Sequence, residues 1–130
     1  MPTPHTKSIV YAIDDDMGVL GSLRFLLETD GFDVRTFRNG ADVLKAVATG
    51  QVDCFVIDYK MPNMNGIDLA SRLRNLDIAA PIILITGCSD EGISAKAAIA
   101  GVHDILLKPH LEDNLAARIR GAIQQDRPCV

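Results

Sequence analysis

The sequence predicts an α/β fold built on a single doubly wound parallel sheet of five strands, with helices on both faces. Apolar runs of strand length alternate along the chain with segments whose apolar residues recur at helical spacing, and this pair repeats five times. Such alternation indicates parallel strands joined by right-handed crossovers, because each helix packs back onto the sheet. The connections are short, so we expect a single domain.

Five strands are predicted. Three are nearly continuous apolar runs, which are typical of strands buried on both faces of a parallel sheet: Ile9–Ile13, Val52–Ile57 and Pro81–Ile85. Shorter runs at Asp33–Phe37 and Ile105–Leu107 supply the second and the fifth strand.

A helix is predicted after each strand. Three helices have one apolar face at 3.6 residues per turn, formed by Val19, Leu20, Leu23, Leu26 and Leu27, by Leu69, Ala70, Leu73 and Leu76, and by Leu111, Leu115, Ile119, Ala122 and Ile123. Weaker patterns predict helices over Ala41–Ala48 and Glu91–Ala100, the second with Ser89–Asp90 as its N-cap. Three glycines follow predicted helices, where a left-handed C-cap favours glycine: Gly31, Gly50 and Gly101.

Composition and charge exclude several classes of protein. The net charge is −4 and the two signs are interspersed, so we expect no direct binding of nucleic acid. No apolar stretch approaches the roughly 20 residues of a membrane span, and the N-terminus lacks the apolar core of a signal peptide. Three cysteines without CxxC spacing indicate neither a disulfide framework nor a zinc site. We expect a cytoplasmic protein, folded over residues 8–123, with frayed ends at residues 1–7 and 124–130.

Residues useful to phosphate or Mg²⁺ follow four of the five predicted strands. Asp14 and Asp15 follow the first strand, Asp58 the third, Thr86 the fourth and Lys108 the fifth. Ligands of open parallel sheets bind just beyond the carboxyl ends of the strands, so we expect these side chains to meet in one pocket. Each residue alone has an ordinary explanation, such as an Asp that caps the following helix. Their coincidence at four strand ends favours a site.

The chemistry of such a pocket is coherent. Mg²⁺ prefers oxygen ligands and is often held by one or two carboxylates, and it relieves the repulsion between crowded carboxylates. A carboxylate is also a nucleophile toward phosphorus and forms an aspartyl phosphate. The charge of the transferring phosphoryl group can be compensated by Mg²⁺, by the Lys108 ammonium and by the Thr86 hydroxyl.

From about Ser8 to Ile123 the chain resembles the receiver domain of a two-component response regulator. Four motifs in the order of that family carry the resemblance: Ile13-Asp14-Asp15-Asp16, Asp58-Tyr59-Lys60-Met61-Pro62-Asn63-Met64-Asn65-Gly66, Ile85-Thr86-Gly87 and Leu107-Lys108-Pro109. The resemblance implies the flavodoxin-like (βα)5 topology. It also implies a signalling switch rather than an enzyme, one that catalyses only its own phosphorylation and dephosphorylation.

The resemblance also implies a role for each site residue. Asp58 would be the phosphoacceptor, and Mg²⁺ would be bound by Asp14, Asp15, Asp58 and the backbone carbonyl of Lys60. Thr86 and Lys108 would bind the phosphoryl group. The donor would be a sensor histidine kinase or a histidine phosphotransfer protein, and the signal would pass to an unknown downstream protein through protein contacts or a phosphorylation-dependent homodimer. No sequence remains for an output domain, so the chain is a stand-alone receiver or part of a longer regulator.

One position departs from the family pattern. Receivers usually carry Phe or Tyr three residues before the conserved Lys, and that aromatic side chain turns inward when the Thr engages phosphate. Ile105 occupies this position here. Phosphorylation does not need the aromatic ring, so the departure concerns how the switch is read out.

A phosphatase of the haloacid dehalogenase type is the alternative. Such enzymes have a D-x-D motif after the first strand, which Asp14-Asp15-Asp16 satisfies with Asp14 as the nucleophile, then a Thr and a Lys that Thr86 and Lys108 would match. They also need an acidic pair after a further strand. Only Glu112-Asp113, within a predicted helix, follows Lys108, and the Asp58 motif would have no role.

Overall fold

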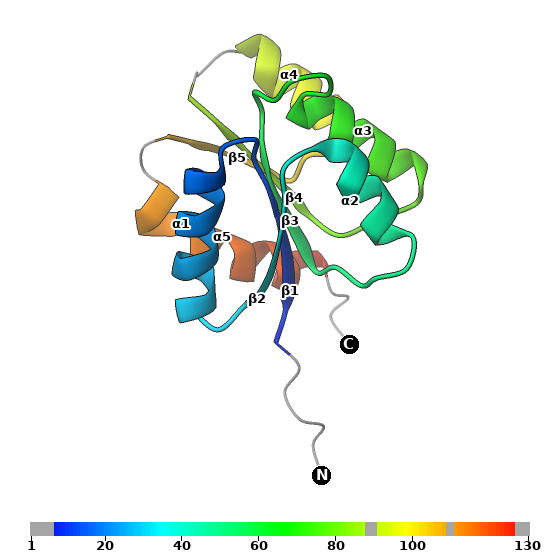
Figure 1. The fold of residues 1–130 in the computed structure, drawn as a ribbon. Coiled ribbons are helices and arrows are strands. Elements are labelled where there is room, and N and C mark those ends of the chain that lie inside the picture. Colours follow the sequence, from blue (N-terminus) through cyan, green and yellow to red (C-terminus); the bar gives the residue numbers. More distant parts are fainter. Residues whose placement is uncertain (1–6, 88–90, 109–110, 127–130) are drawn as a thin grey trace.

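The computed structural model describes residues 7–87, 91–108 and 111–126, in which strands and helices alternate as predicted (Figure 1). The strands are β1 (Ile9–Ile13), β2 (Asp33–Phe37), β3 (Cys54–Asp58), β4 (Ile82–Thr86) and β5 (Asp104–Leu107). The helices are α1 (Met17–Thr29), α2 (Gly40–Val47), α3 (Gly66–Asn75), α4 (Glu91–Ile99) and α5 (Leu111–Asp126).

The five strands form one parallel sheet in the order β2-β1-β3-β4-β5, which confirms the predicted doubly wound fold. The chain turns one way from β1 to β2 and then returns to place β3 on the other side of β1, so a topological switch point lies between β1 and β3. Ile13 pairs with Ile57 in this register, and Asp14 and Asp58 therefore leave the sheet side by side.

Helices cover both faces of the sheet, each with its own apolar cluster (Figure 1). Helices α1 and α5 pack on one face through a cluster that includes Leu20, Leu23, Leu27, Leu115 and Ile119. Helices α2, α3 and α4 pack on the other face through Val43, Val47, Leu69, Leu73 and Ala97. The strands between them are buried from both sides, which is why β3 and β4 read as unbroken apolar runs.

One boundary prediction, at the end of α5, is wrong. Residues 124–126 were expected in a frayed end, but α5 continues through Asp126. Gln124 and Gln125 are good helix formers, and the chain meets a helix-disfavouring position only at the residue before Pro128. The other predicted frayed residues lie outside the described part of the chain, apart from the exposed Lys7, as does the expected Ser89–Asp90 cap.

The predicted left-handed glycines are confirmed at Gly31 (φ 94°) and Gly101 (φ 87°), but Gly50 does not have positive φ. A Cβ at Gly50 would lie 2.8 Å from the Tyr11 hydroxyl oxygen, so glycine supplies space there rather than an unusual backbone angle.

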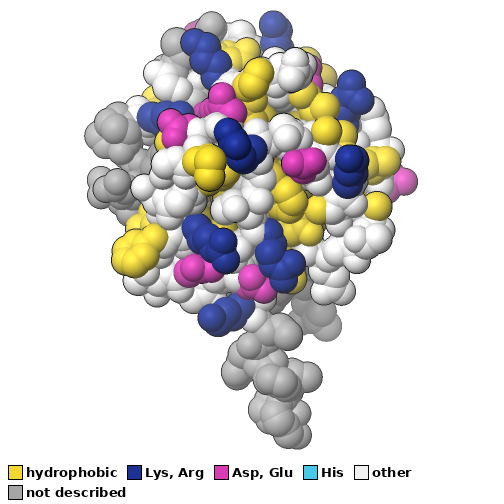
Figure 2. Space-filling view, viewed as in Figure 1, with side chains coloured by type: hydrophobic (Ala, Val, Ile, Leu, Met, Phe, Trp, Pro, Cys, Tyr) yellow, Lys and Arg dark blue, Asp and Glu magenta, His cyan; other side chains and the backbone are white. Residues whose placement is uncertain are grey.

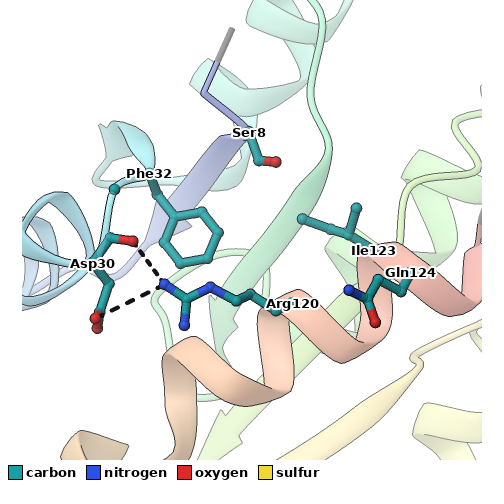
Figure 3. Close-up of a pocket in the computed structure, with 7 residues that line it drawn as sticks. Ser8, Asp30, Phe32, Arg120, Ile123 and Gln124 are labelled. Atoms are coloured by element: carbon teal, nitrogen blue, oxygen red, sulfur yellow. Dashed lines mark hydrogen bonds and ion pairs between the residues drawn. The ribbon is translucent and has the colours of Figure 1, made fainter. Parts of the chain in front are cut away.

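Arg120 joins α5 to the turn between α1 and β2 (Figure 3). Its guanidinium donates a 2.7 Å hydrogen bond to the Asp30 carbonyl oxygen and lies over the Phe32 ring, 5.2 Å from its centroid. A shallow hollow of about 270 Å³ adjoins this contact, with Ser8, Ile123 and Gln124 in its walls. The hollow lies at the amino-terminal edge of the sheet and contains none of the predicted site residues.

Charges of both signs are mixed on the face of the molecule that Figure 2 shows, and neither sign forms a large patch there. In the described part of the chain, no helix has the length and apolar character needed to cross a membrane.

Candidate functional site

Three carboxylates meet at the carboxyl edge of the sheet, as predicted. Oxygen atoms of Asp14, Asp15 and Asp58 all lie within 4.8 Å of one another. Asp14 and Asp58 are buried, with 3% and 5% of their surface exposed, whereas Asp15 is open to solvent. Because β1 and β3 are hydrogen-bonded neighbours, the sheet itself brings Asp58 beside the acidic pair.

Backbone hydrogen bonds fix the acidic segment after β1. The Asp14 N–H donates to the Phe37 carbonyl oxygen at 3.1 Å, which continues the ladder between β1 and β2 by one residue. The Asp14 carboxylate accepts from the Asp16 N–H at 2.9 Å. Asp16 is the N-cap of α1, and its carboxylate accepts from the N–H groups of Gly18 and Val19. The capping role therefore belongs to Asp16, and Asp14 and Asp15 are left for the carboxylate cluster.

Lys108 and Thr86 complete the cluster from the other side. The Lys108 ammonium lies 3.2 Å from Asp58 Oδ1, although its side chain remains 38% exposed. Its backbone N–H donates to the Thr86 carbonyl oxygen at 3.0 Å, so the ends of β4 and β5 are held together. Thr86, the last residue of β4, is buried. The structure thus brings Asp14, Asp15, Asp58 and Lys108 together, with Thr86 at the end of the strand beside Asp58.

The loop between β3 and α3 is packed directly against the site. The Tyr59 N–H donates to the Ile85 carbonyl oxygen at 2.8 Å, and the Gly66 N–H donates to the Tyr59 carbonyl oxygen at 2.9 Å. A Cβ at Gly66 would lie 2.7 Å from the Asp58 carbonyl oxygen and 2.6 Å from Leu84 Cδ1. The N-terminus of α3 can therefore approach the backbone of Asp58 only with glycine at this position. Lys60 lies in this loop with its side chain exposed.

Burial and mutual repulsion shift the acidity of the cluster. Burial is the largest cause that raises the pKa of Asp14, to about 6, and the nearby Asp58 carboxylate adds to it, while the Asp16 N–H opposes it. Burial also raises the pKa of Asp58, and the hydrogen bond and charge of Lys108 oppose this rise. The site therefore holds more negative charge than its environment favours, and one ammonium offsets only part of that charge.

This donor set fits a hard divalent cation. Three carboxylates supply oxygen ligands at close range, and a cation would offset the Asp58 charge that adds to the effect of burial on the pKa of Asp14. Nitrogen and sulfur ligands, which zinc and copper favour, do not belong to this cluster.

Two features of the site could not be read from residue types alone. The steric requirement at Gly66 appears only when the distance to the Asp58 backbone is known, although the glycine in the Asp58 motif is a signal for a close approach. Ile105 lies in β5 opposite Leu84, half-buried among the apolar residues of the α3 and α4 side. Its branched side chain is part of the packing there.

Comparison with known proteins agrees with the sequence motifs. The family model of the response regulator receiver domain matches residues 10–120. The transcriptional regulatory protein FixJ of Bradyrhizobium diazoefficiens is 37% identical over 123 residues, which cover 95% of this chain and 60% of FixJ. The response regulator protein TodT of Pseudomonas putida is 35% identical over 117 residues, which cover 90% of this chain and 52% of TodT. The chain thus spans little more than half the length of these relatives.

Solved structures share the fold. Full-length FixJ from B. japonicum superposes with a TM-score of 0.87 at 37% identity, over 95% of this chain and 61% of that chain. The receiver domain of the Francisella response regulator 1452 gives a TM-score of 0.86 at 26% identity, over 93% of this chain and 100% of that domain. These comparisons give no support to the phosphatase alternative. The chain belongs to the response regulator receiver domain family.

Proposed function

We propose that this protein is a phosphorylation switch in which Asp58 accepts a phosphoryl group from a sensor histidine kinase or a histidine phosphotransfer protein. One observation carries the proposal. Asp58 lies at the centre of the site, within 4.8 Å of the Asp14 and Asp15 carboxylates on one side and 3.2 Å from the Lys108 ammonium on the other. Asp58 ends β3, which lies between β1, followed by Asp14 and Asp15, and the strands β4 and β5 that lead to Lys108. Of the three carboxylates, it is therefore the one placed between the acidic pair and Lys108.

In this proposal Mg²⁺ would be held by the clustered carboxylates of Asp14, Asp15 and Asp58 and by the backbone carbonyl of Lys60, and it would supply charge compensation for the phosphoryl oxygens. An Asp58 carboxylate oxygen attacks phosphorus, the P–N bond of the donor phosphohistidine breaks, and its electron pair leaves with the imidazole. Lys108 pairs with the phosphoryl oxygens once Asp58 has become an acyl phosphate, and the Thr86 hydroxyl donates a hydrogen bond to them. Hydrolysis of the acyl phosphate resets the switch.

The new charge biases the loops that follow β4 and β5 toward a second arrangement. Because Ile105 occupies the position of the usual aromatic residue, we propose that the readout depends on movement of these loops and of α4 rather than on rotation of a ring. The downstream partner would be a protein or a second copy of the phosphorylated chain. The net charge of −4, with both signs interspersed along the sequence and mixed on the face in Figure 2, supports protein contacts over direct contact with nucleic acid. The setting would be the cytoplasm.

The first test is intact-mass measurement after incubation with acetyl phosphate and Mg²⁺. The wild type should gain one phosphoryl group, the Asp58→Asn variant should gain none, and Asp14→Asn should react more slowly because its cation site is weakened. Asp77→Asn is the matched control. Asp77 lies in an exposed turn at φ 61°, which Asn also adopts readily, so this variant should behave as the wild type does.

The same experiment can contradict the proposal in two ways. Modification that persists in Asp58→Asn and disappears in Asp14→Asn would move the nucleophile to β1. A phosphorylation rate that does not change when EDTA replaces Mg²⁺ would refute the role of the carboxylate cluster.

A further inference from the structure

Two asparagines of the chain are followed directly by glycine, in Asn39-Gly40 and Asn65-Gly66. Such a pair can react with itself, because glycine has no side chain to shield its amide nitrogen from the asparagine side chain. The nitrogen loses its proton and attacks Cγ, a cyclic imide forms, and Nδ2 leaves as ammonia. Water then opens the imide. Breaking the new bond between Cγ and nitrogen gives Asp, whereas breaking the original peptide bond gives isoaspartate, whose main chain is longer by one carbon.

The two pairs start from nearly the same local geometry. Asn39 is the N-cap of α2 and Asn65 is the N-cap of α3, and both have extended backbone, with ψ 164° and 173°. Each side-chain oxygen accepts a 2.8 Å hydrogen bond from the third residue of its helix, Asp42 or Asp68. The glycine that follows is buried in both cases. Capping and burial of the glycine therefore do not distinguish the two pairs.

The attacking nitrogen differs between them. The Gly66 N–H donates to the Tyr59 carbonyl oxygen at 2.9 Å. The Gly40 N–H has no hydrogen-bond acceptor within the described residues, and as the first residue of α2 it can have none inside its own helix. An N–H has to leave its acceptor before it can give up its proton, so the nitrogen of Gly66 is held back and that of Gly40 is not.

The room for ring closure differs as well. Closure turns the peptide plane between asparagine and glycine, and the glycine has to shift with it. Gly66 is confined by the Asp58 carbonyl oxygen and by Leu84, which belong to the sheet. The nearest obstacle at Gly40 is the thioether sulfur of Met64, 2.6 Å from the position of a Cβ, and a methionine side chain yields easily. Asn39 is also exposed, whereas Asn65 is half-buried.

We propose that Asn39 is a site of spontaneous deamidation, with water as the co-reactant, and that the fold protects Asn65 from the same reaction. The protected pair adjoins the Asp58 backbone, where the extra main-chain carbon of isoaspartate has no room. At Asn39 the Asp product can still cap α2, and its charge suits the N-terminus of a helix. The isoaspartate product lengthens the connection from β2 to α2. This inference does not depend on the proposed function.

The proposal is tested on the wild type by incubation at mildly alkaline pH, followed by peptide mapping with mass spectrometry. In the folded protein Asn39 should convert at least about tenfold faster than Asn65, because a hydrogen-bonded amide reacts only from a locally opened state. In urea that unfolds the chain, the two rates should agree within about twofold, since glycine follows both asparagines and no fold protects either one. Equal or reversed rates in the folded protein would overturn the proposal, and a ratio that urea leaves unchanged would overturn the role of the fold.

A variant tests the assignment to Asn39 through the ammonia that the reaction releases. Asn39→Ser removes the reactive side chain but keeps a residue that caps helices well, so most of the ammonia release from the folded protein should be lost. Asn75→Ser is the matched control, because Asn75 is exposed and precedes a leucine, and it should release ammonia as the wild type does. Release that is undiminished in Asn39→Ser would refute the site.

Discussion

At the scale of single residues, Gly66 shows how closely the site depends on backbone packing. A side chain here would press on the Asp58 carbonyl oxygen and on Leu84, neither of which can move without disturbing β3 and β4. We expect Gly66→Ala to lower the free energy of unfolding by about 1–3 kcal/mol, the usual cost of overpacking a filled interior. Equilibrium unfolding in urea measures the change.

Gly21→Ala is the matched control for that substitution. Gly21 lies on the exposed side of α1, and no atom lies within 4 Å of the position that its Cβ would take. Alanine is the better helix former, so this variant should be more stable by roughly 0.5–1 kcal/mol. If both variants were equally stabilised, the close approach at Gly66 would be refuted.

Residue types and strand ends predicted which side chains meet at the site, because the carboxyl ends of all strands in a parallel sheet lie at the same edge. Asp14, Asp58 and Lys108 lie where that argument placed them. The sequence could not predict the contacts of Arg74. It is one of several polar residues on its helix, and only the folded chain shows that three carbonyl oxygens converge on it.

At the scale of elements, the capping box of α3 links helix stability to the site. Asn65 Oδ1 accepts from the Asp68 N–H at 2.8 Å, and the Asp68 carboxylate accepts from the Asn65 N–H. Asn65→Ala removes one of these bonds at the entrance to α3, and we expect it to cost about 1 kcal/mol in thermal or chemical unfolding. Asn75→Ala, at the exposed C-terminal end of the same helix, should change stability by less than about 0.5 kcal/mol. Equal losses would show that the cap contributes nothing.

The strands and helices were predictable because their apolar residues are spaced differently. Buried strands appear as unbroken apolar runs, whereas α1, α3 and α5 each have one apolar face at helical spacing. Their ends were less predictable. The length of α5 depends on weak preferences over its last turn, so the sequence pattern does not predict that its last three residues are helical. Gly50 does not have positive φ, and the close approach of the Tyr11 hydroxyl to this position involves a residue too distant in sequence for a local pattern to reveal.

At the scale of the whole molecule, we expect the buried carboxylates to make stability depend on pH and, through the proposed cation site, on Mg²⁺. The pKa of Asp14 is about 6 in the folded chain against 3.8 for the unperturbed group, and the pKa of Asp58 is raised as well. Between these pH values the folded state binds more protons than the unfolded state. The contribution of Asp14 to stability is therefore fully present below about pH 4 and is lost as the pH rises through about 6.

We therefore expect metal-free Asp14→Asn to be more stable than the wild type at pH 8, by an amount on the order of 1–3 kcal/mol, and nearly equal to it at pH 4. Asparagine can still accept the Asp16 N–H, so the substitution removes mainly the charge. Chemical unfolding in EDTA at both pH values measures the difference. Contributions from titrating groups remote from Asp14 cancel between the two proteins, whereas relief of the repulsion on Asp58 adds to the gain of the variant at pH 8. Mg²⁺ should reverse the order at pH 8 by stabilising the wild type more than the variant, whose cation site is weakened. It should have little effect at pH 5, where protons compete for the same carboxylates. Equal responses of both proteins to Mg²⁺ would show that the cation does not bind at this cluster.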